Sequence, residues 1–169
     1  MAAPFTFVLG GARSGKSAVG ERLAAALGPV VTYVATAQPP RDGVDPGFAA
    51  RIAAHRDRRS TGWRTVESGP DLASVLAGLN GPVLVDSLGT WVAGLSDFRA
   101  DPGALCRALI QRDGPTVVVS DEVGLGVVPS TDAGGRFRDA LGEVNTAVAA
   151  VADEVLLVVA GRVLRLGAP

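Results

Sequence analysis

The segment that most constrains the fold is a glycine-rich stretch near the amino end that fits the pattern G-x-x-x-x-G-K-S. An apolar run at 5–9 precedes it, and a helix-compatible stretch at 16–27 follows it. In this context the backbone N–H groups turn inward toward phosphate, and the helix directs its positive end to the same point. The sequence therefore predicts a P-loop that binds a nucleoside triphosphate. Its predicted nucleotide-binding residues are Gly10, Gly11, Ala12, Arg13, Ser14, Gly15, Lys16 and Ser17.

Lysine usage supports this interpretation. The chain has 16 basic residues, and Lys16 is the only lysine among them. In a P-loop this lysine reaches the β and γ phosphates, while the hydroxyl in the position of Ser17 ligates magnesium. We predict Lys16 as a catalytic residue and Ser17 as a ligand of Mg²⁺. The alternative, an ordinary glycine-rich turn before a structural helix, leaves the position of the single lysine unexplained.

A second candidate ligand of Mg²⁺ is Asp86, which ends the apolar run 82–86. An apolar strand that ends in an acid is the form of a Walker B element. Acids also follow strands simply because the chain leaves the sheet into solvent, so the pattern alone does not decide the role. Together with a P-loop, it favours a magnesium-binding Asp86.

Hydrophobic runs alternate with helix-compatible stretches along the whole chain, which predicts one α/β domain over 1–169. The runs are continuous rather than alternating, as in strands that are buried on both faces of a mostly parallel sheet. Two apolar segments around Ala160-Gly161-Arg162 predict a C-terminal antiparallel hairpin. We expect a proline-rich and glycine-rich loop at 38–47. The predicted strands are 5–9, 30–35, 83–86, 116–120 and 155–159, and the predicted helices are 16–27, 48–59, 71–79, 104–111 and 132–152.

Composition excludes several classes of protein. With 16 basic and 17 acidic residues, the chain has no strong overall field that would attract nucleic acid or an anionic membrane. No apolar run is long enough to span a bilayer, so we expect no membrane insertion. The single cysteine, Cys106, cannot form an internal disulfide and suits a small core position. With no leader-like start either, we expect a cytoplasmic protein.

The only histidine, His55, lies within a run of arginines. If this segment is helical, Arg51, His55, Arg58 and Arg59 share one face. The positive charge would favour a neutral imidazole, which can act as a nucleophile or base, and the arginines could hold a triphosphate. A solvated basic face with an incidental histidine is the alternative that spacing alone favours. The residues by themselves thus leave the role of His55 and the acceptor of the reaction open.

Several segments together resemble the bifunctional adenosylcobinamide kinase / adenosylcobinamide-phosphate guanylyltransferase family. They occur in the family's order and cover nearly the whole chain. Besides the P-loop, the similar segments are Tyr33-Val34-Ala35-Thr36-Ala37, Arg51-Ile52 through His55-Arg56, Trp63-Arg64-Thr65-Val66-Glu67, Val85-Asp86, Glu122 through Pro129, Arg136-Phe137-Arg138-Asp139 with Asn145, and Ala152-Asp153-Glu154-Val155 through Gly161.

This resemblance implies a RecA-like P-loop fold and a two-step reaction. ATP or GTP would first phosphorylate adenosylcobinamide. A histidine, by position His55, would then take GMP from GTP and pass it to adenosylcobinamide phosphate, giving adenosylcobinamide-GDP. The resemblance also implies a homotrimer. Beyond the P-loop, it implies nucleotide contacts at Ala35, Thr36, Ala37, Arg56, Asp57, Arg58, Arg59, Glu67 and Asp86.

Two other hypotheses stay open at this point. A P-loop kinase that lacks the guanylyltransferase step would not need His55. A nucleotide-gated assembly module would change its oligomeric state with nucleotide but would not turn substrate over.

Overall fold

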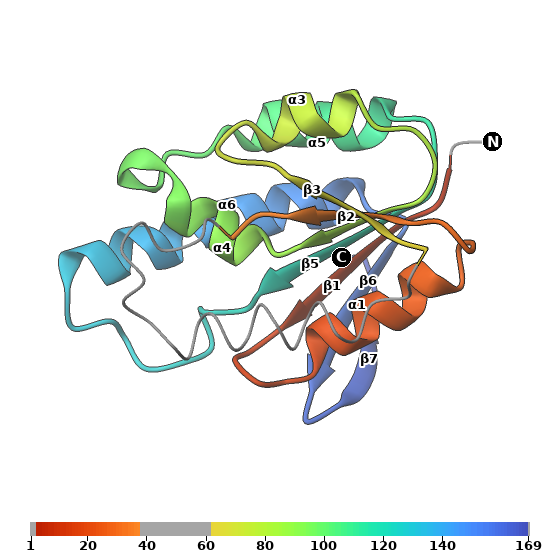
Figure 1. Ribbon diagram of the computed structural model, residues 1–169. Helices are drawn as coiled ribbons and strands as arrows, with labels where there is room; N and C mark the ends of the chain where they lie inside the picture. Colours follow the sequence, from red (N-terminus) through yellow and green to blue (C-terminus); the bar gives the residue numbers. More distant parts are fainter. Residues whose placement is uncertain (1–2, 38–61, 169) are drawn as a thin grey trace.

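The computed structural model describes residues 3–37 and 62–168, which form a seven-stranded sheet with helices on both faces (Figure 1). The strand order is β3-β2-β4-β5-β1-β6-β7. All neighbouring strands pair in parallel except β6 and β7, which form an antiparallel hairpin. The strands are β1 (Phe5–Gly10), β2 (Thr32–Ala35), β3 (Arg64–Glu67), β4 (Val83–Asp86), β5 (Thr116–Asp121), β6 (Glu154–Val159) and β7 (Arg162–Leu166).

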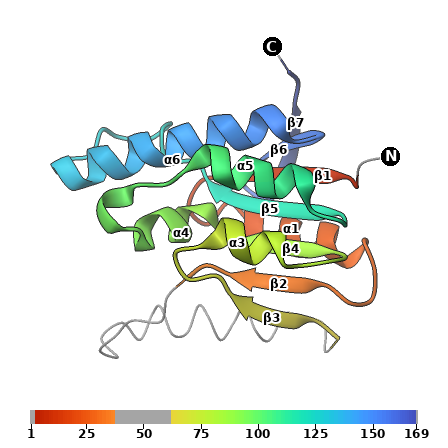
Figure 2. The same cartoon turned by 90° about the horizontal axis from the view of Figure 1, so that it is seen from above.

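The helices divide unequally between the two faces of the sheet. One core cluster packs the sheet against α3, α4, α5 and α6, and a second packs it against α1 (Figures 1 and 2). Both faces of the sheet are covered because an apolar sheet face must be buried against another element. The helices are α1 (Lys16–Ala25), α3 (Leu72–Ala77), α4 (Leu88–Gly94), α5 (Pro102–Gln111) and α6 (Asp132–Val151), with a short 3₁₀ turn at Ser96–Phe98. No helix among the described residues has the length and apolar character to cross a bilayer.

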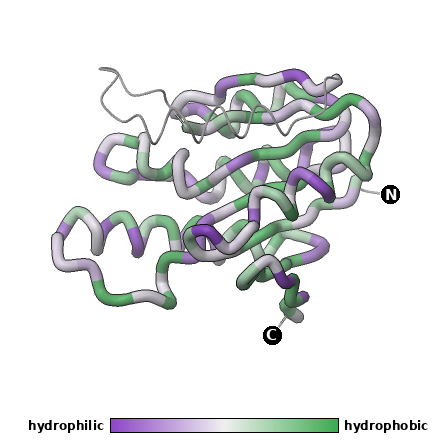
Figure 3. The backbone as a smooth tube through the Cα atoms, turned by 60° about the horizontal axis from the view of Figure 1, so that its bottom comes forward, coloured by the Kyte–Doolittle hydropathy of each residue, from purple (hydrophilic) through white to green (hydrophobic). Residues whose placement is uncertain are grey.

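Strand β1 shows why the apolar runs are continuous. Phe5, Phe7 and Leu9 belong to the cluster under the four helices, whereas Val8 belongs to the cluster under α1. Successive side chains of a strand point to opposite faces, so a strand covered on both sides takes apolar residues at consecutive positions, as β1 does from Phe7 to Leu9. Green hydrophobic segments accordingly run through the middle of the molecule in Figure 3.

The predicted P-loop α/β fold and the C-terminal hairpin are confirmed. Two elements were not predicted, the edge strand β3 and the helix α4. Strand β3 is four residues long and mostly exposed, so it carries no apolar run, and α4 is a short helix that begins directly after β4 at a capping box formed by Ser87. The predicted helix 48–59 and loop 38–47 lie outside the described residues.

The predicted helices 16–27, 71–79, 104–111 and 132–152 are observed as α1, α3, α5 and α6, with small differences at their ends. Helix α5 begins two residues earlier than predicted, because Asp101 caps it by accepting a hydrogen bond from Ala104 N (2.8 Å) and Pro102 occupies its first turn. Helix α6 runs unbroken through its glycines, because its buried side, with Leu141, Val144 and Val148, packs into the core.

A buried arginine links the strands at the amino-terminal end of the sheet. Arg112 is only 7% exposed, and its guanidinium donates to Gly114 O (2.6 Å) and Gly81 O (2.7 Å) as well as to Thr116 Oγ1. Burial lowers the pKa of this guanidinium from its ordinary value, and the adjacent Asp113 carboxylate partly opposes that shift. These contacts join the turns before β4 and β5.

Candidate active site at the phosphate loop

The glycine-rich loop joins β1 to α1 and has a defined shape. Gly15 has φ 92°, in the left-handed region that glycine adopts without strain, and it immediately precedes the helix. A side chain on Gly10 would approach Val158 O to 2.9 Å, so only glycine fits this close to β6. Ser14 N donates to Gly11 O (3.2 Å), and Gly161 N, from the turn between β6 and β7, donates to Ser14 O (2.8 Å). The loop is thus closed internally and fixed from the hairpin.

Lys16 lies across this loop. Its Nζ donates to Gly11 O (3.3 Å) and forms an ion pair with Asp121 Oδ1 at 2.7 Å. The Lys16 side chain is only 12% exposed. A cation held against the loop backbone at the start of a helix is placed to bind the outer phosphates of a nucleotide.

The predicted magnesium ligands come together. Ser17 Oγ donates to Asp86 Oδ1 (3.2 Å), and Tyr33 OH donates to Asp86 Oδ2 (3.2 Å). A hydroxyl and a carboxylate are the hard oxygen donors that Mg²⁺ takes in nucleotide sites, where water and phosphate complete its coordination. The residues therefore fit the ion, although no group of three or more acidic, histidine or cysteine side chains gathers for a metal within 3–37 and 62–168.

Three predicted nucleotide-binding residues share one edge of the sheet. In the strand register Ala35 lies opposite both Glu67 and Asp86, so the carboxyl ends of β3, β2 and β4 are level. Ligands of parallel α/β sheets bind outside this edge. The sheet thus brings Glu67, Ala35 and Asp86 to the side of the molecule on which the P-loop lies.

The next predicted residue, Thr36, is buried at 2% exposure, and its side chain is already engaged. Its Oγ1 donates to Ser87 O (2.6 Å) and lies 2.6 Å from Thr90 Oγ1. It therefore fixes the end of β2 to the start of α4. Ala37 is half-buried directly after it.

The predicted nucleophile and the arginine-rich segment lie outside the residues that the structure describes. These residues are His55, Arg56, Asp57, Arg58 and Arg59. Their roles stay predictions.

Sequence reasoning missed Asp121, the partner of Lys16. It ends β5, two positions beyond Val119, which pairs with Asp86. The signal was present, because Thr116–Asp121 is an apolar strand that ends in an acid, just as Val83–Asp86 is. The predicted strand stopped at Ser120, one residue short.

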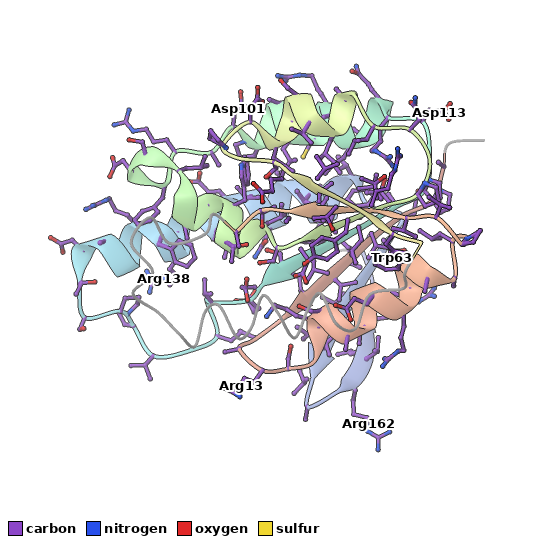
Figure 4. The ribbon with its side chains drawn as sticks, in the orientation of Figure 1. Arg13, Trp63, Asp101, Asp113, Arg138 and Arg162 are labelled. Atoms are coloured by element: carbon purple, nitrogen blue, oxygen red, sulfur yellow. The ribbon has the colours of Figure 1, made fainter. Side chains whose placement is uncertain are left out.

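A cavity of about 420 Å³ borders the outer side of the loop. Its walls include Arg13 and Glu122 together with the apolar side chains of Leu125 and Val159. Leu125 is 83% exposed and Val127 beside it is 95% exposed. Figure 4 shows Arg13 at the same end of the molecule as Arg162 of the hairpin. The surface next to the phosphate loop is therefore apolar with a charged rim.

Comparison with known proteins defines the family. A family model described as "Cobinamide kinase / cobinamide phosphate guanyltransferase" matches residues 6–166. The chain belongs to this family. The match to the cobinamide kinase / guanyltransferase model covers nearly the whole chain. It confirms the family resemblance predicted from the sequence and the predicted enzyme class.

Curated relatives agree with the family model. The chain is 40% identical over 163 residues to "Bifunctional adenosylcobalamin biosynthesis protein CobP" of Pseudomonas aeruginosa, an alignment that covers 91% of this chain and 92% of the relative. It is 37% identical over 176 residues to "Bifunctional adenosylcobalamin biosynthesis protein CobU" of Salmonella typhimurium, an alignment that covers 91% of this chain and 94% of the relative. Among solved structures, the P4 protein of bacteriophage phi6 in complex with ADP is similar with a TM-score of 0.45 and 19% identity, covering 95% of this chain and 52% of that chain.

Proposed function

We propose that this chain phosphorylates adenosylcobinamide with ATP or GTP. We propose further that it then transfers GMP from GTP, through a guanylyl-His55 intermediate, to adenosylcobinamide phosphate, which gives adenosylcobinamide-GDP. The observation that carries the proposal is the joint placement of Lys16, Ser17 and Asp86 at the phosphate loop of a chain that belongs to the cobinamide kinase / guanyltransferase family.

In the kinase step, the hydroxyl oxygen of the acceptor forms a bond to the γ-phosphorus while the bond from that phosphorus to the nucleoside diphosphate breaks. Catalysis of this step is mainly positioning and stabilisation of charge on the transferred group. Lys16, together with the backbone N–H groups of the loop, would stabilise that charge. Ser17 and Asp86 would hold Mg²⁺, which neutralises phosphate charge when bound.

In the guanylyl step, a ring nitrogen of His55 would form a bond to the α-phosphorus of GTP, and pyrophosphate would leave. A phosphate oxygen of the acceptor would then displace the imidazole and take the GMP group. Histidine suits this role because the neutral ring is a nucleophile and becomes a good leaving group after protonation. The neighbouring Arg56, Arg58 and Arg59 would favour the neutral ring and bind phosphate.

A homotrimer in the cytoplasm completes the proposal. The trimer rests on the family resemblance. The cytoplasmic location rests on the lone cysteine of the chain and on its similarity to relatives named as biosynthesis proteins. Light scattering on the purified protein would measure the oligomer, and a mass of one or two chains would contradict the trimer.

The test is the intact mass of the purified protein after incubation with magnesium and GTP, repeated with His55→Ala. We expect a gain of one guanylyl group in the parent protein and no gain in the variant. No gain in either protein would contradict the histidine intermediate. The kinase-only alternative would then be tested by phosphorylation of adenosylcobinamide, which it predicts His55→Ala to perform at the parent rate.

A further inference from the structure

We propose that Asp121 is a positioning residue that holds Lys16 when the nucleotide site is empty and competes with the γ-phosphate for it. Lys16 must exchange Asp121 for phosphate when a nucleoside triphosphate binds, so Asp121 weakens triphosphate binding. The inference rests on the part of the proposed function in which Lys16 binds phosphate. It does not depend on guanylyl transfer by His55.

The contact itself is short and sheltered. Lys16 Nζ and Asp121 Oδ1 are 2.7 Å apart, and the two side chains are 12% and 29% exposed. An ion pair with this exposure is screened by solvent less than a surface pair is. Asp121 is therefore a strong competitor for the cation that the phosphates require.

The surrounding structure holds the carboxylate in this position. Ser87 Oγ donates to Asp121 Oδ2 (3.0 Å), which leaves the other oxygen, Oδ1, for Lys16. A side chain on Gly89 would overlap this carboxylate, because its Cβ would lie 2.9 Å from Asp121 Cγ. Gly89 thus leaves the space that Asp121 occupies.

The backbone of Asp121 is fixed as well. Asn145 Nδ2 donates to Asp121 O (3.0 Å), and Ser120 Oγ donates to Asn145 Oδ1 (2.6 Å). Asn145 is 7% exposed within α6. A buried amide with both ends satisfied locks the end of β5, so Asp121 has little freedom to follow Lys16 when the lysine moves.

Two carboxylates therefore flank the phosphate loop in different roles. Asp86 is bonded to the hydroxyls of Ser17 and Tyr33, whereas Asp121 is bonded to the cation. Incoming phosphate brings negative charge beside Asp121, and like charges at short range repel. The repulsion and the loss of the ion pair both oppose triphosphate binding, and the isosteric neutral asparagine would remove both.

The experiment compares nucleotide binding by calorimetry in a His55→Ala background, in which covalent transfer from GTP cannot occur. Asp121→Asn should lower the Kd for GTP with magnesium by about two- to fivefold, the range for a partly exposed ion pair. The Kd for GDP should change less, because GDP lacks the γ-phosphate. Asp139→Asn is the matched control. It removes one negative charge at an exposed position paired with Arg138, and it should leave both Kd values unchanged.

A second variant tests the same contact from the other side. Gly89→Ala should displace the Asp121 carboxylate and lower the Kd for GTP in the same direction. With His55 present, Asp121→Asn should lower the KM for the phosphate donor and should not raise kcat. Lower Kd values in both variants would support the proposal. An unchanged or higher Kd for GTP in Asp121→Asn would overturn it, and so would weaker binding that appears only with magnesium, because that result would make Asp121 a metal ligand.

Discussion

Each end of the sheet holds a cation, half-buried Lys16 at one end and buried Arg112 at the other, and the partners of the two cations differ. At the carboxyl end Lys16 faces the carboxylate of Asp121. At the amino end Arg112 donates to Gly81 O, Gly114 O and Thr116 Oγ1. In Figure 4, Arg13 of the phosphate loop marks the carboxyl end, and Asp113, which follows Arg112 in the sequence, marks the amino end.

The difference separates a structural cation from a functional one. The carbonyls around Arg112 are parts of turns that no ligand could replace, so this guanidinium can only hold the backbone together. The partner of Lys16 is a charged side chain, and under the proposed function a phosphate takes its place. The two cations therefore differ in whether a ligand could replace their partner.

Replacing Lys16 should produce the largest effect at the carboxyl end. We expect Lys16→Ala to lower kcat/KM of the kinase step by on the order of 10²–10³-fold, because it removes a positive charge aimed at the transferred phosphate. Its free energy of unfolding should fall by less than about 1 kcal/mol, since the lost ion pair is partly exposed. Steady-state kinetics and urea titration measure the two quantities. A larger loss of stability than this would show that Lys16 is structural as well.

Arg112→Met should show the opposite pattern. We expect a loss of about 3 kcal/mol in the free energy of unfolding, because several buried carbonyls lose their donor. The kcat and KM of the folded protein should match those of the parent at low temperature. Arg107→Met is the control, because Arg107 is an exposed arginine on α5, the helix that ends immediately before Arg112. A fall in kcat of Arg112→Met with an unchanged free energy of unfolding would contradict the structural role of Arg112.

Ser17→Ala should have a smaller and more specific effect. We expect the magnesium concentration for half-maximal kinase activity to rise about tenfold, because one oxygen ligand is lost. The exposed Ser74 on α3 supplies the control, and Ser74→Ala should leave the magnesium dependence as it is. An unchanged magnesium requirement in Ser17→Ala would remove Ser17 from the metal site.

Alkylation of Cys106 should show the smallest effect and reports on α5, which packs on the core away from the phosphate loop. Burial raises the pKa of this thiol on α5, so more of it is protonated at pH 8 than in an unfolded chain. Iodoacetamide should therefore react more slowly with the folded protein than with the unfolded one, and faster as pH rises. The pH dependence of stability follows from the same shift. The folded state favours the neutral thiol, so this contribution to the free energy of unfolding is lost as pH rises through the raised pKa. GTP should leave the alkylation rate unchanged, and a large change would show that nucleotide binding alters the packing of α5.

The sequence was most informative where a pattern is local. The P-loop, the Walker B strand and the hairpin are each specified by residues that lie next to one another, and all three were predicted. Strand β3 was not, because its four residues pair through the backbone with β2 and bury little. The contact between Lys16 and Asp121 was also missed. It joins residues more than a hundred positions apart, and only the sheet order, which places β5 beside β1, brings them together.

The hydrogen bond from Gly161 N to Ser14 O has a consequence for protein engineering. The phosphate loop is encoded near the start of the chain, yet one of its carbonyls is held by the turn before the final strand. A graft of the eight-residue motif into another scaffold would carry the consensus without this support. A truncation after β6 and before Gly161 would likewise leave the consensus intact and the loop without this hydrogen bond. A graft of this phosphate loop should therefore include the turn at Gly161 as well as the eight-residue motif.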